Sequence, residues 1–265
     1  MPVRPFDGGA EIGTRIAGCI GVRERRSVVA VVTRALPEPQ HAHFVASLVQ
    51  SSRDVPCDLL FSTIHTNDPY DLAAITGKLK AQSYLFIEPD GFHPALNRLA
   101  RRGDARFAVW GQPGPDTLYP WVGPDNFSIG HLATCELLKR GARRIAYIGA
   151  TDTPAMQQRF LGYTKALFDN GLSFVAGRVL ETVPAQGPVD VDAGFVAQED
   201  RVAAAIAWAG DLPLVVYSAE PGLKVAARIS IDMAVASNRV LGWLVEPEGS
   251  VRRPGELFPP RLVQG

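Results

Sequence analysis

Short apolar runs alternate with helically patterned segments along most of this chain. The runs 27–33 and 214–218 are continuous and rich in β-branched residues, as are strands that are buried on both faces of a parallel sheet. Segments with helical spacing of apolar positions lie between such runs, for example 126–139, which Gly141 would end. This alternation predicts an α/β fold with parallel sheets.

The predicted elements fall into two sets, one before residue 120 and one after residue 143. The simplest architecture is therefore two open α/β lobes with a cleft between them, and ligands of such sheets sit beyond the carboxyl ends of the strands. The predicted strands are 27–33, 58–62, 83–87, 106–110, 144–148, 178–181 and 214–218, and the predicted helices are 43–51, 71–79, 95–101, 126–139, 157–169 and 199–208.

Composition and charge narrow the class of protein. Hydrophobic residues make up 46% and charged residues 20% of the 265 residues, as in ordinary globular proteins that are large enough for two lobes. The 27 basic residues balance the 27 acidic ones, which disfavours a nucleic-acid surface on this chain itself. There is no apolar run of membrane-spanning length and no signal-peptide pattern, so we expect a cytoplasmic protein without a membrane partner.

Motifs of catalysis and cofactor binding are absent from the sequence. It has no G-x-G-x-x-G after a strand, no phosphate-binding G-x-x-x-x-G-K-[ST] and no G-x-S-x-G. Its three cysteines are widely spaced, and its five histidines do not have the spacing of metal ligands. We therefore expect free thiols, no cofactor, no metal site and no enzymatic activity.

Four residues near the carboxyl ends of predicted strands are candidate ligand contacts. Arg34 and His43 follow the first strand, and Trp110 and Ser218 end two later ones. His43 could donate a hydrogen bond to a ligand, or it could be a solvated loop histidine. Trp110 could stack on an apolar ligand face, or it could pack in the core or between the lobes.

One stretch of about fifty residues, 122–172, is more specific and resembles the lactose/galactose-repressor (LacI/GalR) family. That family has a strand ending in V-x-x-D-N, a helix with G-x-x-A-x-x-x-L, a strand R-I-a-x-I-G and the pattern R-x-x-G-Y-x-x-A-L-x-x-x-G. The corresponding residues here are Asp125, Asn126, Gly130, Ala133, Leu137, the segment 141–149, Arg159, Gly162, Tyr163, Ala166, Leu167 and Gly171.

Looser similarity extends over most of 27–265 and includes Phe44 at an aromatic position of the family. The resemblance implies a two-lobed, periplasmic-binding-protein-like sensor that dimerises and binds a sugar or similar metabolite between its lobes, thereby changing its affinity for operator DNA. It implies an N-terminal lobe of 27–124 plus about 227–248, and a C-terminal lobe of 125–226 plus about 249–265. Residues 1–26 would form an arm or linker.

The resemblance also implies roles for two side chains. Arg159 matches an arginine that donates hydrogen bonds to ligand hydroxyls, and its planar fork suits vicinal hydroxyls or a carboxylate. Asp125 matches an acidic residue at the crossover between the lobes and can accept hydroxyl donors. The alternatives are a surface salt bridge for Arg159 and a helix N-cap for Asp125.

The sequence departs from the family in two places. Residues 1–26 are too short and glycine-rich for the family's helix-turn-helix, so operator DNA would be contacted by an N-terminal head that this chain does not contain. After 214–218 the chain runs almost directly into its closing segment, and Ala219 stands where the family has a ligand-binding aspartate. About one βαβ unit, roughly 30 residues, is missing by this comparison, which leaves open whether the second lobe is complete.

Two other classes of protein share parts of this pattern. A solute-binding protein of a sugar transport system would have the same fold, but it would need an export signal. A Rossmann-like enzyme would need the phosphate-binding and catalytic motifs that the sequence lacks.

Overall fold

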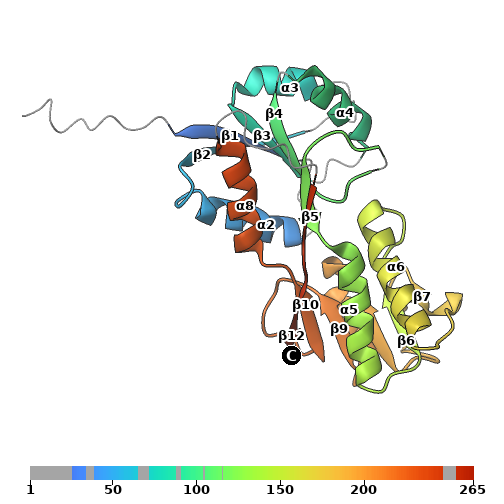
Figure 1. Cartoon of the computed structure of the whole chain (residues 1–265). Helices are drawn as coiled ribbons and strands as arrows, with labels where there is room; N and C mark the ends of the chain where they lie inside the picture. Colours follow the sequence, from blue (N-terminus) through green and yellow to red (C-terminus); the bar gives the residue numbers. More distant parts are fainter. Residues whose placement is uncertain are drawn as a thin grey trace, which may run out of the picture.

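The computed structural model describes residues 26–33, 39–64, 72–87, 91–103, 105–114, 116–246 and 255–265. The chain forms two α/β lobes, one above the other in Figure 1, and each lobe is built on a six-stranded sheet. This confirms the predicted α/β class with two mainly parallel sheets. None of the helices in these ranges is long and apolar enough to cross a membrane.

The first lobe has a wholly parallel sheet with the strand order β11-β5-β4-β3-β1-β2. Helices α2 and α8 cover one face, and α3 and α4 cover the other. The strands are β1 (Ser27–Thr33), β2 (Cys57–Thr63), β3 (Ser83–Ile87), β4 (Arg106–Trp110), β5 (Trp121–Pro124) and β11 (Gly255–Phe258), and the helices are α2 (Pro39–Ser51), α3 (Leu72–Leu79), α4 (His93–Arg102) and α8 (Met233–Val245).

The continuous apolar run of β1 follows from this double cover. Val29 and Val31 point into the core formed with α2 and α8, whereas Ala30 and Val32 point into the core formed with α3 and α4. All four side chains are buried. A strand with helices on both faces needs apolar residues at every position, because successive side chains alternate between the faces.

The second lobe has the strand order β12-β10-β9-β8-β6-β7, and only β12 is antiparallel to its neighbour. Helices α5 and α6 cover one face, and α7 covers the other. The strands are β6 (Ile145–Ile148), β7 (Val179–Leu180), β8 (Ala193–Val196), β9 (Leu214–Tyr217), β10 (Ala227–Ser230) and β12 (Arg261–Gln264), and the helices are α5 (Asn126–Lys139), α6 (Pro154–Asp169) and α7 (Val202–Ala209), with two short 3₁₀ turns, η2 (Ala176–Arg178) and η3 (Glu199–Arg201).

The lobe assignment differs from the expected one in two segments near the C-terminus. Strand β10 was expected in the first lobe, but it pairs in parallel with β9 of the second. Strand β11 was expected in the second lobe, but it pairs in parallel with β5 of the first. The chain therefore passes between the lobes after β10 and again between β11 and β12. Strand β10 lies between β9 and β12 in the second sheet, whereas β11 forms the edge of the first sheet beside β5. The expected arm lies almost wholly outside the described residues, which begin at Arg26.

The connection between β9 and β10 contains no helix. Residues 218–226 return the chain to the start of the sheet, and the pairing extends beyond the strands through hydrogen bonds from Ser218 N to Ile229 O (3.1 Å) and from Ala226 N to Leu214 O (2.8 Å). The family has a crossover helix at this point, and its absence agrees with the βαβ unit that the sequence comparison found missing. The position beside β9 is nevertheless filled, because β10 occupies it.

Candidate functional site

Arg159, the first of the expected ligand contacts, lies in α6 beside the carboxyl ends of β8 and β9 in the second lobe. Thr153 caps this helix by accepting a hydrogen bond from Met156 N, and Pro154 occupies the first turn. Buried tyrosines hold the helix on the sheet: Tyr163 donates to the carbonyl of Ile145 at 2.9 Å, and burial raises its pKa to about 12. Arg159 is therefore carried by a rigid element rather than by a loop.

The Arg159 guanidinium is buried, with only 1% of the residue exposed. Its Nε donates to Asn126 Oδ1 at 2.8 Å, its Nη1 donates to the carbonyl of Ala197 at 2.5 Å, and its Cζ lies 4.1 Å from the centroid of the Tyr217 ring. These partners come from α5, from the end of β8 and from the end of β9. The alternative of a surface salt bridge is therefore wrong for Arg159.

Two glycines allow α5 and α6 to cross at backbone contact beside this arginine. A Cβ atom on Gly130 would lie 1.9 Å from the carbonyl oxygen of Arg159, and a Cβ on Gly162 would lie 2.1 Å from the carbonyl oxygen of Phe127. No side chain fits at such distances. The two glycines of the sequence motif therefore set the position of Arg159 relative to α5.

Asp125 lies at the crossover between the lobes and caps α5. Its carboxylate accepts from Ser128 N at 3.0 Å and from Ser128 Oγ at 2.7 Å, which confirms the N-cap interpretation. Its backbone N–H donates to the carbonyl of Phe258 at 3.0 Å. The segment from β5 to α5 and the segment from β11 to β12 therefore lie side by side where they pass between the lobes. Contact between Asp125 and an effector remains a prediction.

Asn126, the next residue, links the two lobes through its side chain. Its Nδ2 donates to Oε1 of Gln112, which follows β4 in the first lobe, while its Oδ1 accepts from Arg159 in the second. The sequence motif contained Asn126 but did not indicate this role. A hydrogen-bonded chain of side chains thus runs from the first lobe to the buried guanidinium.

The aromatic candidates of the first lobe pack on each other. The rings of Phe44 and Trp110 are stacked with centroids 3.7 Å apart, and the Phe258 ring stacks with Trp110 at 6.1 Å. Phe44 and Trp110 are fully buried, so in this structure they form core rather than an open stacking surface. His43, in the same helix as Phe44, is exposed, and Arg34 lies outside the described residues.

Ser218, at the end of β9, is buried and hydrogen-bonded to an acid that sequence reasoning did not single out. Its Oγ donates to Glu199 Oε1 at 2.5 Å, and Ala219 N donates to the same oxygen at 2.8 Å. Glu199 begins η3, directly beyond β8. The signal that could have identified it is its place at the carboxyl end of a strand, but β8 was itself not among the predicted strands.

The structure thus brings Arg159 and Ser218 to neighbouring strand ends of the second lobe, with Asp125 at the nearby crossover. Gln112, Asn126, Tyr217 and Glu199 complete the polar surroundings. Hydrogen-bond donors and acceptors converge there on a small region between two lobes, which is the arrangement of small-molecule binding sites in open α/β folds.

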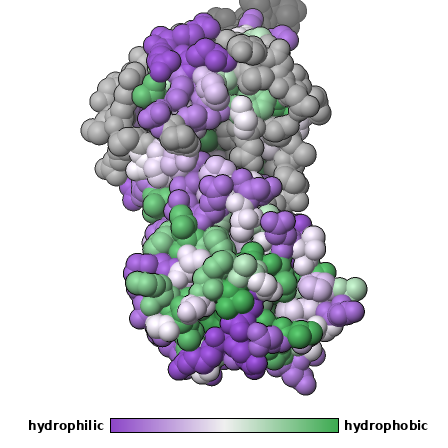
Figure 2. Space-filling model, turned by 90° about the vertical axis from the view of Figure 1, so that its right-hand side faces the viewer, coloured by the Kyte–Doolittle hydropathy of each residue, from purple (hydrophilic) through white to green (hydrophobic). Residues whose placement is uncertain are grey.

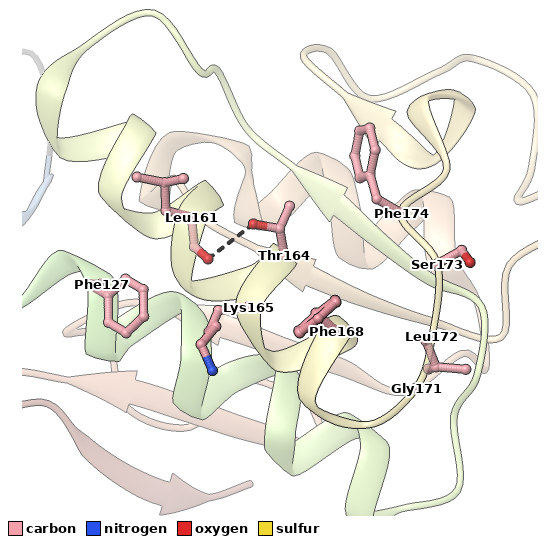
Figure 3. A pocket seen from close by; sticks show the side chains of 9 residues that line it. All are labelled: Phe127, Leu161, Thr164, Lys165, Phe168, Gly171, Leu172, Ser173 and Phe174. Atoms are coloured by element: carbon pink, nitrogen blue, oxygen red, sulfur yellow. Dashed lines mark hydrogen bonds between the residues drawn. The ribbon is translucent and has the colours of Figure 1, made fainter.

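A separate apolar groove of about 770 Å³ lies on the outer side of α6 (Figure 3). Phe127, Leu161, Phe168 and Phe174 line it, and Phe168 is 77% exposed. Hydrophobic side chains gather on this side of the lower lobe in Figure 2. Because Leu161 is exposed while Arg159 is buried, the groove and the arginine lie on different faces of α6.

The comparisons with known proteins identify the fold. No family model and no curated protein sequence matches the chain. Solved structures match over nearly its whole length: the Escherichia coli transcriptional repressor ascG (TM-score 0.73, 13% identity, 90% of this chain and 97% of that one), a regulatory protein of the LacI family from Chloroflexus aggregans (0.72, 18%, 89% and 97%), and the transcriptional regulator CelR in complex with cellobiose (0.68, 21%, 95% and 88%).

These similarities define the chain as a two-lobed, periplasmic-binding-protein-like α/β protein. Within that class, it has the fold of transcription regulators of the LacI type, which confirms the predicted resemblance at the level of the fold.

Proposed function

We propose that this chain is the effector-binding and dimerisation domain of a LacI-type DNA-binding transcription regulator that senses a sugar or a related small metabolite. It acts in the cytoplasm as a sensor and not as an enzyme, and operator DNA is bound through an N-terminal head beyond this chain. The observation that carries the proposal is the buried Arg159 guanidinium, held between α5, β8 and β9 at the strand ends that face the first lobe.

The chemistry of this guanidinium suits a hydroxylated ligand. Two of its nitrogens are engaged by Asn126 and Ala197, whereas Nη2 makes no hydrogen bond to any described residue and can donate to a ligand oxygen. Fixed donors of this kind orient a ligand at little entropic cost. Opening and closing of the lobes would give the ligand access to the site.

The hydrogen bonds that join Gln112 to Asn126 and Asn126 to Arg159 suggest how binding is transmitted. A ligand that engages Arg159 acts on a link between the two lobes, and it stabilises whichever lobe arrangement it binds more tightly. A solute-binding protein of a transport system would use the same fold. The solved structures named above are transcription regulators and favour the regulator.

We expect a cognate effector to raise the melting temperature of the purified chain. At about 100 times its dissociation constant it adds roughly 2.7 kcal/mol to the stability of the folded state. The measurement is differential scanning fluorimetry against sugars (D-ribose, D-glucose, D-galactose, cellobiose), their phosphates, polyols and nucleobases. A chain that none of these compounds stabilises would argue against a sensor of hydroxylated metabolites.

We propose the exposed edge of β2 as the dimer interface. Among the described strands, β2 ends the first sheet and pairs only with β1, yet it exposes 38% of Leu60 and 46% of Phe61. Edge strands of monomers are usually protected by charge or cover, and two copies of one edge can pair about a two-fold axis. The Phe61→Lys variant is expected to sediment as a monomer while the wild-type chain sediments as a dimer.

The groove on α6 provides the matched control for this experiment. The Phe168→Lys variant places the same charge on a second exposed apolar surface and is expected to stay dimeric. The reverse result, with only Phe168→Lys dissociating, would move the interface to α6. A wild-type monomer at concentrations of tens of micromolar would refute dimerisation.

A further inference from the structure

Glu199 has a half-satisfied carboxylate in the interior of the second lobe. The residue is 8% exposed, and its Oε1 accepts hydrogen bonds from Ser218 Oγ and Ala219 N. Its Oε2 is buried and has no hydrogen-bond partner among the described residues. No cation in the described part of the chain forms an ion pair with Glu199.

An unpaired carboxylate oxygen inside a protein is costly, because it gives up its hydration without receiving a donor in return. Oε1 alone accounts for any structural role, since it ties the start of the 218–226 connection to η3. Oε2 contributes nothing to that connection. A buried acceptor of this kind is available to a donor that is supplied from outside the protein.

Glu199 borders the same strand ends as Arg159. It lies two residues beyond Ala197, whose carbonyl accepts from Arg159, and it is bonded to Ser218, the neighbour of the Tyr217 ring that lies under the guanidinium. The turn η3 also lies against α2 of the first lobe, so Glu199 is on the side of the second lobe that faces the first.

We propose that Glu199 is an effector contact that determines specificity: Oε2 accepts a hydrogen bond from a hydroxyl group of the ligand, while Arg159 donates to another of its oxygens. This inference rests on the proposed function and extends it to the ligand. A carboxylate and a guanidinium that are not paired with each other require a donor at one end of the ligand and an acceptor at the other. An uncharged compound with several hydroxyl groups supplies both, whereas an anionic group placed at Glu199 would be repelled.

The test compares Glu199→Gln with Glu220→Gln by isothermal titration with each compound of the wild-type panel that raises the melting temperature. A glutamine keeps an acceptor for Ser218 and Ala219 but turns an NH₂ group toward the ligand. The affinity of Glu199→Gln is expected to fall about 10- to 100-fold, the worth of a hydrogen bond to a charged group. Glu220 is exposed, and its variant is expected to bind within about twofold of wild type.

The melting temperature of the ligand-free variant separates this role from a structural one. Removal of an unpaired buried charge leaves the melting temperature of Glu199→Gln equal to or above that of wild type. A lower melting temperature with unchanged affinity would show that Glu199 is only structural and would overturn the proposal. If wild type binds a panel compound and Glu199→Gln binds it equally well, the Glu199 inference fails alone. If wild type responds to no panel compound, the proposed function fails and this inference fails with it.

Discussion

Replacing Gly130 with alanine is expected to lower the free energy of unfolding by about 3 kcal/mol, which is at the upper end of the cost of overpacking. The added Cβ would lie 1.9 Å from the carbonyl oxygen of Arg159 and 3.1 Å from its Cα. These are backbone atoms of a neighbouring helix, so no rotation of a side chain can relieve the clash. Helices α5 and α6 would have to separate, and the buried contacts between them would be lost.

Urea unfolding of the purified variant measures this effect, and Gly242→Ala is the matched control. Gly242 also lies within a helix, α8, but a Cβ there would meet no atom within 4 Å. That variant is expected to gain about 0.5–1 kcal/mol, because alanine is the better helix former. Equal small changes in both variants would contradict the close crossing of α5 and α6.

The Gly130 variant should also lose part of its response to the effector. The clash falls on the backbone of Arg159, so relief of the clash moves the guanidinium away from Asn126. Gly162→Ala should act in the same way from the other helix, where the added Cβ would lie 2.1 Å from the carbonyl oxygen of Phe127.

Replacing Arg159 with alanine is expected to abolish effector binding and to cost about 3 kcal/mol of stability. The change leaves Asn126 Oδ1 and the carbonyl of Ala197 without their donors in the interior, and it removes the cation from the Tyr217 ring. Each buried group left unsatisfied costs roughly 1–3 kcal/mol. Urea unfolding and titration with the panel compounds measure the two effects separately.

Arg144→Ala is the matched control, since Arg144 is 51% exposed and pairs with Asp190 and Asp192 at the surface. Loss of such an exposed pair is expected to cost no more than about 1 kcal/mol and to leave binding unchanged. Arg159→Lys retains the charge but not the planar fork, and it should recover part of the stability without full affinity. Wild-type affinity in Arg159→Ala would place the ligand elsewhere.

The alternation of strands and helices could be predicted because it is a local pattern. The continuous apolar run of β1 predicts a strand, and the apolar spacing of α5 and its capping Asp125 predict a helix. The motif around Arg159, Gly130 and Gly162 likewise lies within one contiguous stretch. The sequence by itself therefore determined the α/β class, most helices and strands, and the arginine at the centre of the candidate site.

Tertiary structure alone decided the features that depend on pairing between distant segments. The four-residue strands β10 and β11 belong to a lobe only through the neighbouring strands with which they pair, and the local sequence pattern does not indicate that pairing. Phe44 and Trp110 became core because stacking on each other buries both rings. Glu199 contacts Ser218 because β8 and β9 are neighbours in the sheet. This pairing places Glu199 Oε1 and Ser218 Oγ 2.5 Å apart, although the two residues are 19 positions apart in the sequence.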